Sequence, residues 1–497
     1  MWKSFSLLTI LLLSSSATVL FGQTEAPDPR QLEGAVETHF DLFYLPDRET
    51  GMKEDRFVQL DVQIPAGDGP FPAIIFLHGG GGERGNKNGL YRGQIRTAME
   101  RALDSGYVVV NLGHMLNHTG HGASQRSWDV RSAIRFLRHR ASQFQIDPAR
   151  MGAWGFSAGG TIITTTAMAT AGDVREHPAP PEIAASGLAT IEAPYDDPRP
   201  EYETENGRLT AIVADSWSDR GLLTKDDPAI LTYIGTGGRH KTADIAESTG
   251  ADIHYLELTG EDFAGKGYIH VPPLDSEAVW DEGNATGTVE DAVFAWLDKK
   301  LKNQPRTVPP EARPNRRWVT PGTEVHLIPA SEDTAIIYTL DGSEPDTTSP
   351  RYTEPIVIDP PMTIRAKAKH PDQDASEAVT FEYVKASNPA RLVPKTERLP
   401  PGKVGEPYEF QFEVQWPREM AATPSALLFH TTGHLMTERD RRSGEWQNDS
   451  GLSIEPRTGL LSGTPEAAGA YTFQVQAIDP KSGQVDARDY LLVIERE

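Results

Sequence analysis

Residues 151–160, MGAWGFSAGG, place a single serine, Ser157, among glycines and other small residues. The pattern Gly-x-Ser-x-Gly is typical of a sharp turn between a strand and a helix, in which larger neighbours would collide with the backbone. The flanking segments suit this turn, because Met151–Trp154 can form the strand and Thr161–Ala171 a helix of small residues. The sequence therefore predicts that Ser157 stands on a strained turn at a helix N-terminus, where backbone N–H groups favour negative charge.

A second glycine-rich segment lies upstream, at residues 77–82, with the sequence LHGGGG. It follows an apolar run and precedes a helical pattern, which is the setting of a loop whose backbone N–H groups bind a substrate oxygen. We assign this oxyanion hole to the N–H groups of Gly80, Gly81 and Ala158. A phosphate-binding loop is the alternative, but the Lys-Ser/Thr pair that completes such a loop does not follow the glycines.

The segment from about residue 35 to 303 alternates apolar runs with helical patterns. Apolar runs typical of strands buried on both faces occur at Phe71–Leu77 and Tyr107–Leu112, and later strands are expected at Ala229–Ile234 and Ile253–Leu258. Helical spacing occurs at Tyr91–Ser105, Trp128–Phe144 and Val289–Leu301, the last opened by Thr288 and Asp291 at capping-box spacing. This alternation predicts an α/β fold with a doubly wound, mostly parallel sheet.

The helix predicted at residues 128–144 is amphipathic. Its apolar face carries Val130, Ile134, Leu137 and Ala141. Its opposite face carries Arg131, Arg135, Arg138 and His139.

Taken together, these motifs resemble the α/β-hydrolase superfamily, in particular its esterase and lipase group related to hormone-sensitive lipase and to bacterial feruloyl and acetyl-xylan esterases. Residues 78–87, HGGGGERGNK, resemble the oxyanion loop of that group. Residues 129–160, DVRSAIRFLRHRASQFQIDPARMGAWGFSAGG, resemble its helix, its Asp-Pro-x-Arg turn and its serine elbow. The resemblance covers about residues 50–302 and implies a serine hydrolase, whose substrate the fold does not determine.

The resemblance also implies a histidine in a loop after the last parallel strand. His270, in GKGYIHVP at residues 265–272, holds that position, although the glycine that usually precedes the histidine is replaced by Ile269. His254 lies inside the preceding strand, where we expect it to be packed. His270 is therefore the expected general base for Ser157.

Three aspartates are candidates for the carboxylate that orients His270. The family usually places this acid after its seventh strand, where the first carboxylate in this chain is Asp244. In some hydrolases the acid follows the sixth strand instead, and Asp196 and Asp197 follow the apolar segment Gly187–Ile191. Asp196 is the first choice and Asp197 and Asp244 are the alternatives, while capping of a turn is the other role open to the Asp196–Asp197 pair.

Two groups of side chains have the residue types of metal ligands. The first follows the strand at residues 107–112 and consists of His114, His118 and His121. No neighbouring carboxylate completes a ligand set, so substrate contact and polar surface are the alternatives. The second consists of Asp341, Glu344 and Asp346, for which a turn is favoured over a calcium site. We therefore expect no metal and no cofactor.

The N-terminal residues 1–23, MWKSFSLLTILLLSSSATVLFGQ, combine a lysine, an apolar run and small residues. This pattern predicts a signal peptide at residues 1–22 and export to the periplasm or the extracellular space. Because Ser14–Ser16 break the apolar run, we expect no membrane span in the mature chain. The chain contains no cysteine, which excludes a disulfide framework, and its net charge of −23 argues against nucleic acid as a partner.

Residues 304–315 are predicted to form a Pro-rich linker, beyond which apolar residues follow the period of a strand. This predicts two β-sandwiches, at residues 316–385 and 390–497. Residues 336–345, IIYTLDGSEP, resemble the chitobiase C-terminal type of sandwich, and residues 399–408, LPPGKVGEPY, resemble Ig- or cadherin-like modules of secreted bacterial proteins. We expect both modules to be non-catalytic spacers or weak binders of glycans or surfaces.

The sequence thus predicts a secreted serine esterase that cleaves carboxylic esters, with acyl groups on polysaccharide as the favoured substrates. The substrate class follows from the resemblance, because such sandwich modules commonly accompany secreted esterases that act on polymers. A serine peptidase of the prolyl-oligopeptidase type and a non-catalytic binding protein with the α/β-hydrolase fold are the alternatives.

Overall fold

The computed structural model describes most of the chain. The described residues are 28–44, 58–81, 84–114, 123–168, 174–178, 190–194, 205–215, 223–238, 249–267, 269–280, 285–314, 318–319, 321–385, 391–393, 398–415, 428–433, 437–438, 446–447, 451–455, 457–466, 468–478 and 485–496. The predicted signal peptide and the three candidate acids, Asp196, Asp197 and Asp244, lie outside these residues. Within the described part, no helix combines the length and the apolar character needed to cross a membrane.

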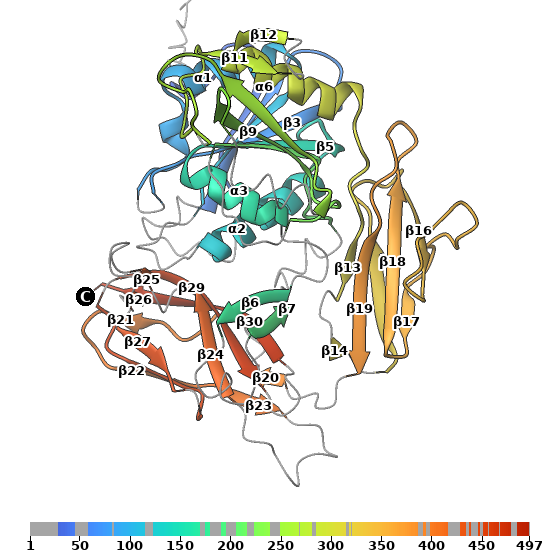
Figure 1. Cartoon of the computed structure of the whole chain (residues 1–497). Coiled ribbons are helices and arrows are strands. Elements are labelled where there is room, and N and C mark those ends of the chain that lie inside the picture. The colour runs from blue at the N-terminus through green and yellow to red at the C-terminus, as the bar shows by residue number, and fades with distance from the viewer. Residues whose placement is uncertain are drawn as a thin grey trace, which may run out of the picture.

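A mixed sheet with helices on both faces forms the first part of the chain, and two all-β modules follow it (Figure 1). In the described residues the sheet has the strand order β1-β2-β4-β3-β5-β8-β9-β10-β11-β12. These strands are β1 (Ala35–Phe43), β2 (Gln59–Pro65), β3 (Phe71–Leu77), β4 (Val108–Leu112), β5 (Ile146–Gly155), β8 (Ala211–Ala214), β9 (Ala229–Gly235), β10 (Ile253–Leu258), β11 (Glu277–Trp280) and β12 (Ala285–Thr288). The run from β4 to β10 is parallel, and antiparallel strands extend it at both edges.

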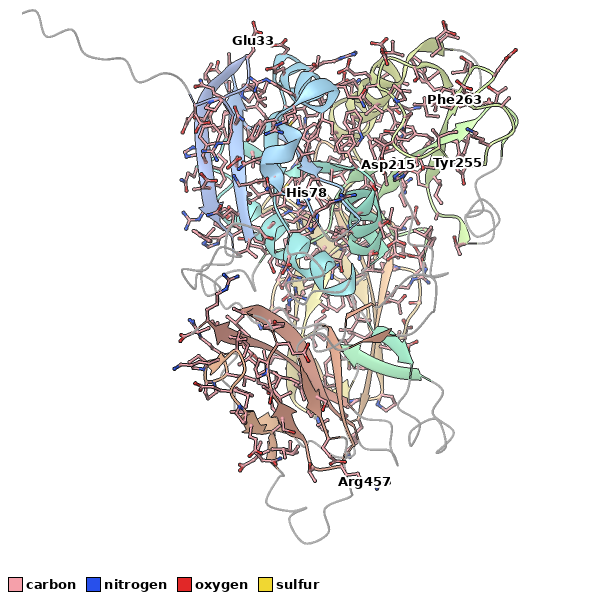
Figure 2. The ribbon with its side chains drawn as sticks, turned by 90° about the vertical axis from the view of Figure 1, so that its left-hand side faces the viewer. Glu33, His78, Asp215, Tyr255, Phe263 and Arg457 are labelled. Carbon is pink, nitrogen blue, oxygen red and sulfur yellow. The ribbon has the colours of Figure 1, made fainter. Side chains whose placement is uncertain are left out.

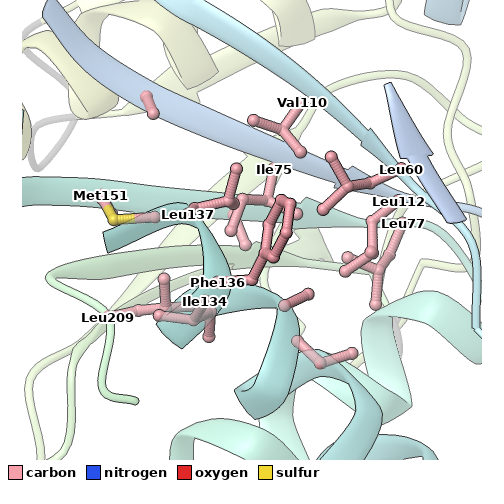
Figure 3. Close-up of a cluster of buried hydrophobic side chains, with 14 of the residues drawn as sticks. Leu60, Ile75, Leu77, Val110, Leu112, Ile134, Phe136, Leu137, Met151 and Leu209 are labelled. Carbon is pink, nitrogen blue, oxygen red and sulfur yellow. The ribbon is translucent and has the colours of Figure 1, made fainter. Parts of the chain in front are cut away.

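The inner parallel strands β3, β4, β8 and β9 are buried at nearly every position because helices cover both faces of the sheet. Helices α2 (Ala123–His139) and α3 (Ala158–Met168) share one hydrophobic core with the strands. Helices α1 (Gly93–Asp104) and α6 (Val289–Asp298) share the other. Figure 3 shows part of the first core, in which Ile134 and Leu137 of α2 lie near Ile75 of β3.

The predicted α/β fold with a doubly wound, mostly parallel sheet is confirmed. Strands β3 and β10 have the predicted bounds, and β4 and β9 differ from theirs by one residue at one end. The capping box at Thr288 and Asp291 is also present, with each side chain accepting from the other residue's backbone N–H. Helix α6 then passes into a short π-helical turn at Lys299–Asn303, η6.

One expected strand lies elsewhere. Thr190 and Ile191, the described residues of the apolar segment Gly187–Ile191, begin β7 (Thr190–Pro194), which pairs antiparallel with β6 (Val174–Pro178) in a separate two-stranded sheet. The position beside β5 in the large sheet belongs to β8 instead. The strand before Asp196 is therefore not the sixth strand of the central sheet, and the role of Asp196, which lies outside the described residues, stays a prediction.

Each of the two all-β modules is a pair of sheets around a hydrophobic core, as predicted. The first module consists of β13 (Glu311–Arg313), β15 (Thr323–Ile328) and β17 (Ile356–Ile358), packed on β14 (Trp318–Val319), β19 (Val379–Lys385), β18 (Met362–Lys369) and β16 (Ala335–Thr339). The second consists of β21 (Gly402–Lys403), β30 (Val485–Glu495), β29 (Gly469–Ile478) and β24 (Leu428–Gly433), packed on β22 (Tyr408–Gln411), β28 (Leu460–Gly463) and β27 (Leu452–Ile454). Short pairs complete the described strands: β20 (Arg391–Val393) with β23 (Glu413–Gln415), and β25 (Thr437–Glu438) with β26 (Trp446–Gln447).

The predicted linker is partly folded. Residues 311–313 form β13, which pairs antiparallel with β15 and so belongs to the first β-module. The proline-rich residues before β13 are also bound, since Asn206 of the α/β domain donates from Nδ2 to the carbonyl oxygens of Pro309, at 2.9 Å, and Ile328, at 3.1 Å. The module is therefore docked on the α/β domain rather than held at the end of a free spacer.

A buried ion-pair cluster lies at this junction. Glu311 of β13 accepts from the guanidinium of Arg135 at 2.9 Å and lies 3.4 Å from that of Arg131, both on α2. Arg313 approaches the same carboxylate at 3.2 Å. Arg131, Arg135 and Glu311 are each at most 2% exposed. The arginine face of α2 is thus an interface with the first β-module.

The cluster requires a charged Glu311. Burial by itself would raise the pKa of Glu311, but the charges of Arg135, Arg131 and Arg313 outweigh burial and hold the pKa well below its usual range. Breaking a buried ion pair at one partner is costly, because the remaining charge stays buried without compensation.

We therefore expect Glu311→Gln to lower the free energy of unfolding by about 3–5 kcal/mol, as measured by urea unfolding at pH 7. Because the folded-state pKa is depressed, this stabilisation is fully present above the unfolded-state pKa of about 4.3 and is lost as the pH falls below it. The difference in unfolding free energy between the wild type and Glu311→Gln should therefore become smaller at acidic pH.

Glu324→Gln is the matched control, since Glu324 lies on the neighbouring strand β15 with an exposed side chain. Its unfolding free energy should stay within about 0.5 kcal/mol of the wild type. Equal stabilities of Glu311→Gln and Glu324→Gln at pH 7 would contradict a stabilising role for the cluster.

Candidate active site

Two turns meet at the carboxyl ends of β3 and β5. These strands are parallel neighbours with Leu77 opposite Gly155, and the N–H of Phe156 donates to the carbonyl of Leu77 at 3.0 Å. The chain leaves both strands at the same edge of the sheet, where ligands of parallel sheets commonly bind. The glycine loop after β3 and the serine turn after β5 are therefore adjacent.

Ser157 stands in a strained backbone conformation between β5 and α3. Its φ is +53°, in the left-handed region that residues with a side chain rarely adopt. A Cβ on Gly155 would lie 2.5 Å from the carbonyl oxygen of Gly159, and one on Gly159 would lie 2.5 Å from that of Leu77. The turn thus needs glycine at both flanking positions, for the steric reason that the sequence pattern indicated.

The glycine loop after β3 packs directly on this turn. A Cβ on Gly79 would lie 2.8 Å from the Cβ of Ser157, and one on Gly80 would collide with the backbone of Arg84. Gly80 and Gly81 have φ values of +121° and +69°, and no atom lies within 4 Å of a Cβ added to Gly81. Gly79, to which the sequence analysis gave no role, is the glycine that touches the serine turn.

Two of the three residues predicted to form the oxyanion hole, Gly80 and Gly81, lie in this loop. The third, Ala158, begins α3. The first N–H groups of a helix have no intrahelical acceptor, so the N–H of Ala158 has no partner within α3. The glycine loop and the N-terminus of α3 both lie next to Ser157.

A buried lysine anchors the chain that follows the glycine loop. Lys87 is 2% exposed, and its ammonium group lies 2.6 Å from the carboxylates of both Asp61 and Asp41. The hydroxyl of Tyr91 donates to the same Asp61 at 2.8 Å. The loop is therefore held at its far end by a fixed charge cluster on β1 and β2, which limits its freedom to move away from Ser157.

His78 and His114 stack beside the glycine loop, with ring centroids 4.2 Å apart and an interplanar angle of 14°. Both are buried, and His114 Nε2 lies 3.3 Å from the carbonyl oxygen of His78. His114 thus packs against the backbone of the loop. His118 and His121 lie outside the described residues.

His270 reaches Ser157 from the loop between β10 and β11. Its Nε2 lies 3.3 Å from Ser157 Oγ, within reach of a hydrogen bond that commonly tightens once substrate binds. The neighbouring Ile269 is buried and its N–H donates to the carbonyl of Tyr233 at 3.3 Å, which fixes the loop on β9. The structure therefore brings Ser157 and His270 together, although 113 residues separate them.

A carboxylate that the sequence analysis did not consider lies behind the serine. Asp215 directly follows β8, is 1% exposed and accepts from the N–H of Ser157 at 2.5 Å. Figure 2 shows Asp215 and His78 inside the α/β domain. Burial raises the pKa of Asp215 to about 7, against the opposing effect of backbone N–H groups from Ser157 and Val271.

The run AIVAD at residues 211–215 is the signal that could have identified Asp215. It has an apolar strand followed by an acid, which is the pattern sought for the sixth strand, but β8 is only four residues long. The sequence analysis took the apolar segment Gly187–Ile191 as the sixth strand instead of residues 211–214. A short strand between two long connections carries too few residues for periodicity to reveal it.

The remaining candidates are engaged in local structure. His254 lies on β10, as expected, with Nε2 at 2.7 Å from Asp252. Asp341 accepts from Ser343, Asp346 accepts from Thr348, and Glu344 pairs with Arg365 and Lys367. In the described part of the chain, no group of three or more His, Asp or Glu side chains is arranged to hold a metal ion.

Three family models match parts of the chain. Residues 60–213 match BD-FAE, a family of esterase-type α/β-hydrolases, residues 317–380 match the chitobiase/beta-hexosaminidase C-terminal domain, and residues 450–495 match the Ig domain model He_PIG. The first part of the chain is therefore similar to esterase-type α/β-hydrolases over residues 60–213, and the two β-modules contain segments similar to the chitobiase C-terminal and Ig types. The BD-FAE match contains Ser157 and the glycine loop, whereas Asp215 and His270 lie beyond its end.

Solved structures similar to this chain include several esterases. A truncated carbohydrate esterase from gut microbiota is 17% identical, with 45% of this chain and 88% of that chain covered and a TM-score of 0.33. A bifunctional GH43-CE protein of Bacteroides eggerthii is 15% identical, with 53% and 35% covered and a TM-score of 0.37.

Esterase 2 of Thermogutta terrifontis, solved after phosphorylation by paraoxon, is 19% identical, with 55% of this chain and 95% of that chain covered and a TM-score of 0.34. Structural similarities with such low identities and TM-scores say nothing about the activity of this chain. No curated protein sequence matches the chain.

The close contact at Gly159 can be tested through stability. A methyl group there would lie 2.5 Å from the carbonyl oxygen of Leu77 and 2.7 Å from that of His78, and neither backbone group can rotate away. We expect Gly159→Ala to lower the free energy of unfolding by at least about 2 kcal/mol in urea unfolding, as overpacking does in tightly packed interiors.

Gly89→Ala is the control for that substitution. No atom lies within 4 Å of a Cβ added to Gly89, in the short helical turn η3 (Lys87–Leu90). Its stability should stay within about 0.5 kcal/mol of the wild type. A Gly159→Ala protein as stable as Gly89→Ala would show that the serine turn and the glycine loop are not in tight contact.

Proposed function

We propose that this protein is an exported serine esterase that hydrolyses carboxylic esters, with acyl groups on polysaccharide as its substrate class. The observation that carries the proposal is the distance of 3.3 Å between Ser157 Oγ and His270 Nε2, beside a loop of glycines. A serine hydroxyl is a weak nucleophile unless a neighbouring base accepts its proton. The exposed imidazole of His270 is in place to do so.

The chemistry follows from this geometry. Ser157 Oγ attacks the ester carbonyl while His270 Nε2 takes the hydroxyl proton, and the negative charge that forms on the carbonyl oxygen is bound by the N–H groups of Gly80, Gly81 and Ala158. His270 then protonates the leaving alcohol, which leaves an acyl group on Ser157. A water molecule, deprotonated by His270, cleaves that acyl-enzyme and restores the serine.

The carboxylate that orients His270 remains a choice among Asp196, Asp197 and Asp244. A wrong imidazole tautomer costs about 10⁴-fold in kcat when this carboxylate becomes an amide. We keep Asp196 as the first candidate and expect Asp196→Asn to show a loss of this size with p-nitrophenyl acetate. A near-normal rate in Asp196→Asn, together with a large loss in Asp197→Asn or Asp244→Asn, would move the role to that residue.

The polysaccharide substrate class is supported by the architecture of the chain. A chitobiase-type module and an Ig-type module accompany the esterase-type domain, and both are compatible with binding of a carbohydrate or a surface. His270 is exposed and Ser157 is half-buried, which is compatible with access by a polymer-linked ester. Release of acetate from acetylated xylan, measured beside p-nitrophenyl acetate hydrolysis, tests this part of the proposal.

Export is supported by the sequence of residues 1–22, which has the charged, apolar and small-residue regions of a signal peptide. The absence of cysteine in the whole chain is compatible with an oxidising compartment, since no thiol is available for oxidation. Expression of the full chain in a bacterial host, followed by N-terminal sequencing of the protein outside the cytoplasm, tests cleavage of this segment.

The nucleophile can be tested directly. We expect Ser157→Ala to lower kcat with p-nitrophenyl acetate by about 10⁴-fold or more, because the substitution removes the hydroxyl that forms the acyl-enzyme. A fluorophosphonate probe should label the wild type on the peptide that contains Ser157, as read by mass spectrometry. The Ser157→Ala protein should remain unlabelled.

Ser343→Ala is the control, since Ser343 lies exposed in a turn of the first β-module. It should retain full turnover and labelling. Equal background turnover in the wild type and in Ser157→Ala would reject the esterase proposal and favour a non-catalytic binding protein with this fold.

A further inference from the structure

Asp215 has no role in the mechanism above, yet it is one of the most deeply buried charged groups in the α/β domain. It is 1% exposed and lies at the carboxyl end of β8, the strand next to β5. Burying a carboxyl group is costly unless hydrogen bonds compensate it. The hydrogen-bond donors around Asp215 therefore indicate the role of this carboxyl group.

The groups that bind this carboxylate come from the two loops that carry Ser157 and His270. The N–H of Ser157 donates to Oδ1 at 2.5 Å. The backbone N–H of Val271 also faces this carboxyl group, since it acts to lower the pKa of Asp215. Val271 immediately follows His270 in the chain. One side chain thus contacts the backbone of the serine turn and the backbone of the histidine loop.

Both of those backbone segments are strained. Ser157 has a φ of +53° and Val271 a φ of +43°, and a β-branched residue in the left-handed region is a marked outlier. Strained residues of this kind persist only where surrounding contacts hold them. The N–H groups of both residues face the same carboxyl group, and that of Ser157 donates to it.

We propose that Asp215 is a positioning residue that holds the serine turn and the histidine loop on one shared acceptor and so sets the distance between Ser157 Oγ and His270 Nε2. This inference rests on the proposed function, because it assigns Asp215 a part in the serine–histidine reaction. Misplacement of reacting groups by about 1 Å can cost about 10²-fold in rate. The carboxylate would act through backbone geometry and not by touching substrate.

The alternative role, that of the acid which orients His270, fits Asp215 less well. Its Oδ1 is occupied by the N–H of Ser157, and its Oδ2 is buried without a hydrogen-bond partner among the described residues. An acid that orients the imidazole would accept from Nδ1 of His270. The two roles also predict different effects of an amide at this position, which makes them separable.

The test compares Asp215→Ala with Asp215→Asn in p-nitrophenyl acetate hydrolysis. Asp215→Ala removes both acceptor oxygens, so we expect kcat to fall about 10²-fold while KM changes less than about threefold. Asp215→Asn keeps one carbonyl oxygen in place of Oδ1, so we expect it to restore kcat to within about fivefold of the wild type. Should Asp215→Ala fail to fold, Asp215→Val fills the site without an acceptor and takes its place.

Two results would overturn the proposal. Wild-type kcat in the variant without an acceptor would show that Asp215 does not position the site. A loss of about 10⁴-fold in Asp215→Asn, as large as in Asp215→Ala, would identify Asp215 as the acid that orients His270.

Asp227→Asn is the matched control for a buried aspartate. Asp227 is 6% exposed, burial raises its pKa to about 8, and it lies before β9, at the opposite edge of the sheet from Asp215. We expect kcat and KM of Asp227→Asn to match the wild type. A loss of kcat in this control equal to that in Asp215→Ala would show that any buried aspartate of the sheet affects the rate, and would overturn the specific role.

Hydrogen exchange separates this inference from the proposed function. In Asp215→Ala, the peptides that contain Ser157 and Val271 should exchange their amide hydrogens faster than in the wild type, while those of β3 should not change. This readout needs no turnover. A wild type that hydrolyses no ester would reject the proposed function, whereas unchanged exchange at Ser157 and Val271 would reject the shared acceptor.

Discussion

The close approach of two backbones at the edge of the sheet is the constraint on which the rest of the α/β domain depends. Gly159, in the first turn of α3, lies so near the carbonyls of Leu77 and His78 that a Cβ would be only 2.5 and 2.7 Å away. The approach brings the glycine loop against the serine turn and fixes Ser157 at a φ of +53°. A close approach of this kind places a strained serine beside several backbone N–H groups.

The parts of this arrangement that could be predicted from the sequence are those set by local sterics and burial. Strand β3 was predicted with its observed bounds, because a strand covered on both faces must be apolar at nearly every position. The serine turn was predicted because only small residues fit its flanks. In each case the cause lies within a few residues of the pattern.

The parts that could not be predicted depend on contacts between distant segments. Asp215 follows a strand of four residues, and its partners are the backbones of Ser157 and Val271, which no local pattern reveals. The arginines of α2 have the spacing of a polar helix face, but their partner, Glu311, lies in a segment that was predicted to be a linker. A basic face looks the same in sequence whether water or a buried carboxylate covers it.

The arginine face of α2 also links the β-modules to the candidate site. Helix α2 packs its apolar face on the sheet, contacts α3, and turns its arginines to Glu311 of the first β-module. The second module contributes Leu491 and Val493 of β30 to the same core. Since α3 begins directly after Ser157, the helix layer that supports the serine is held from the sheet on one side and from the β-modules on the other. The modules are therefore part of the framework of the site, and a binding role for them would come in addition to that structural one.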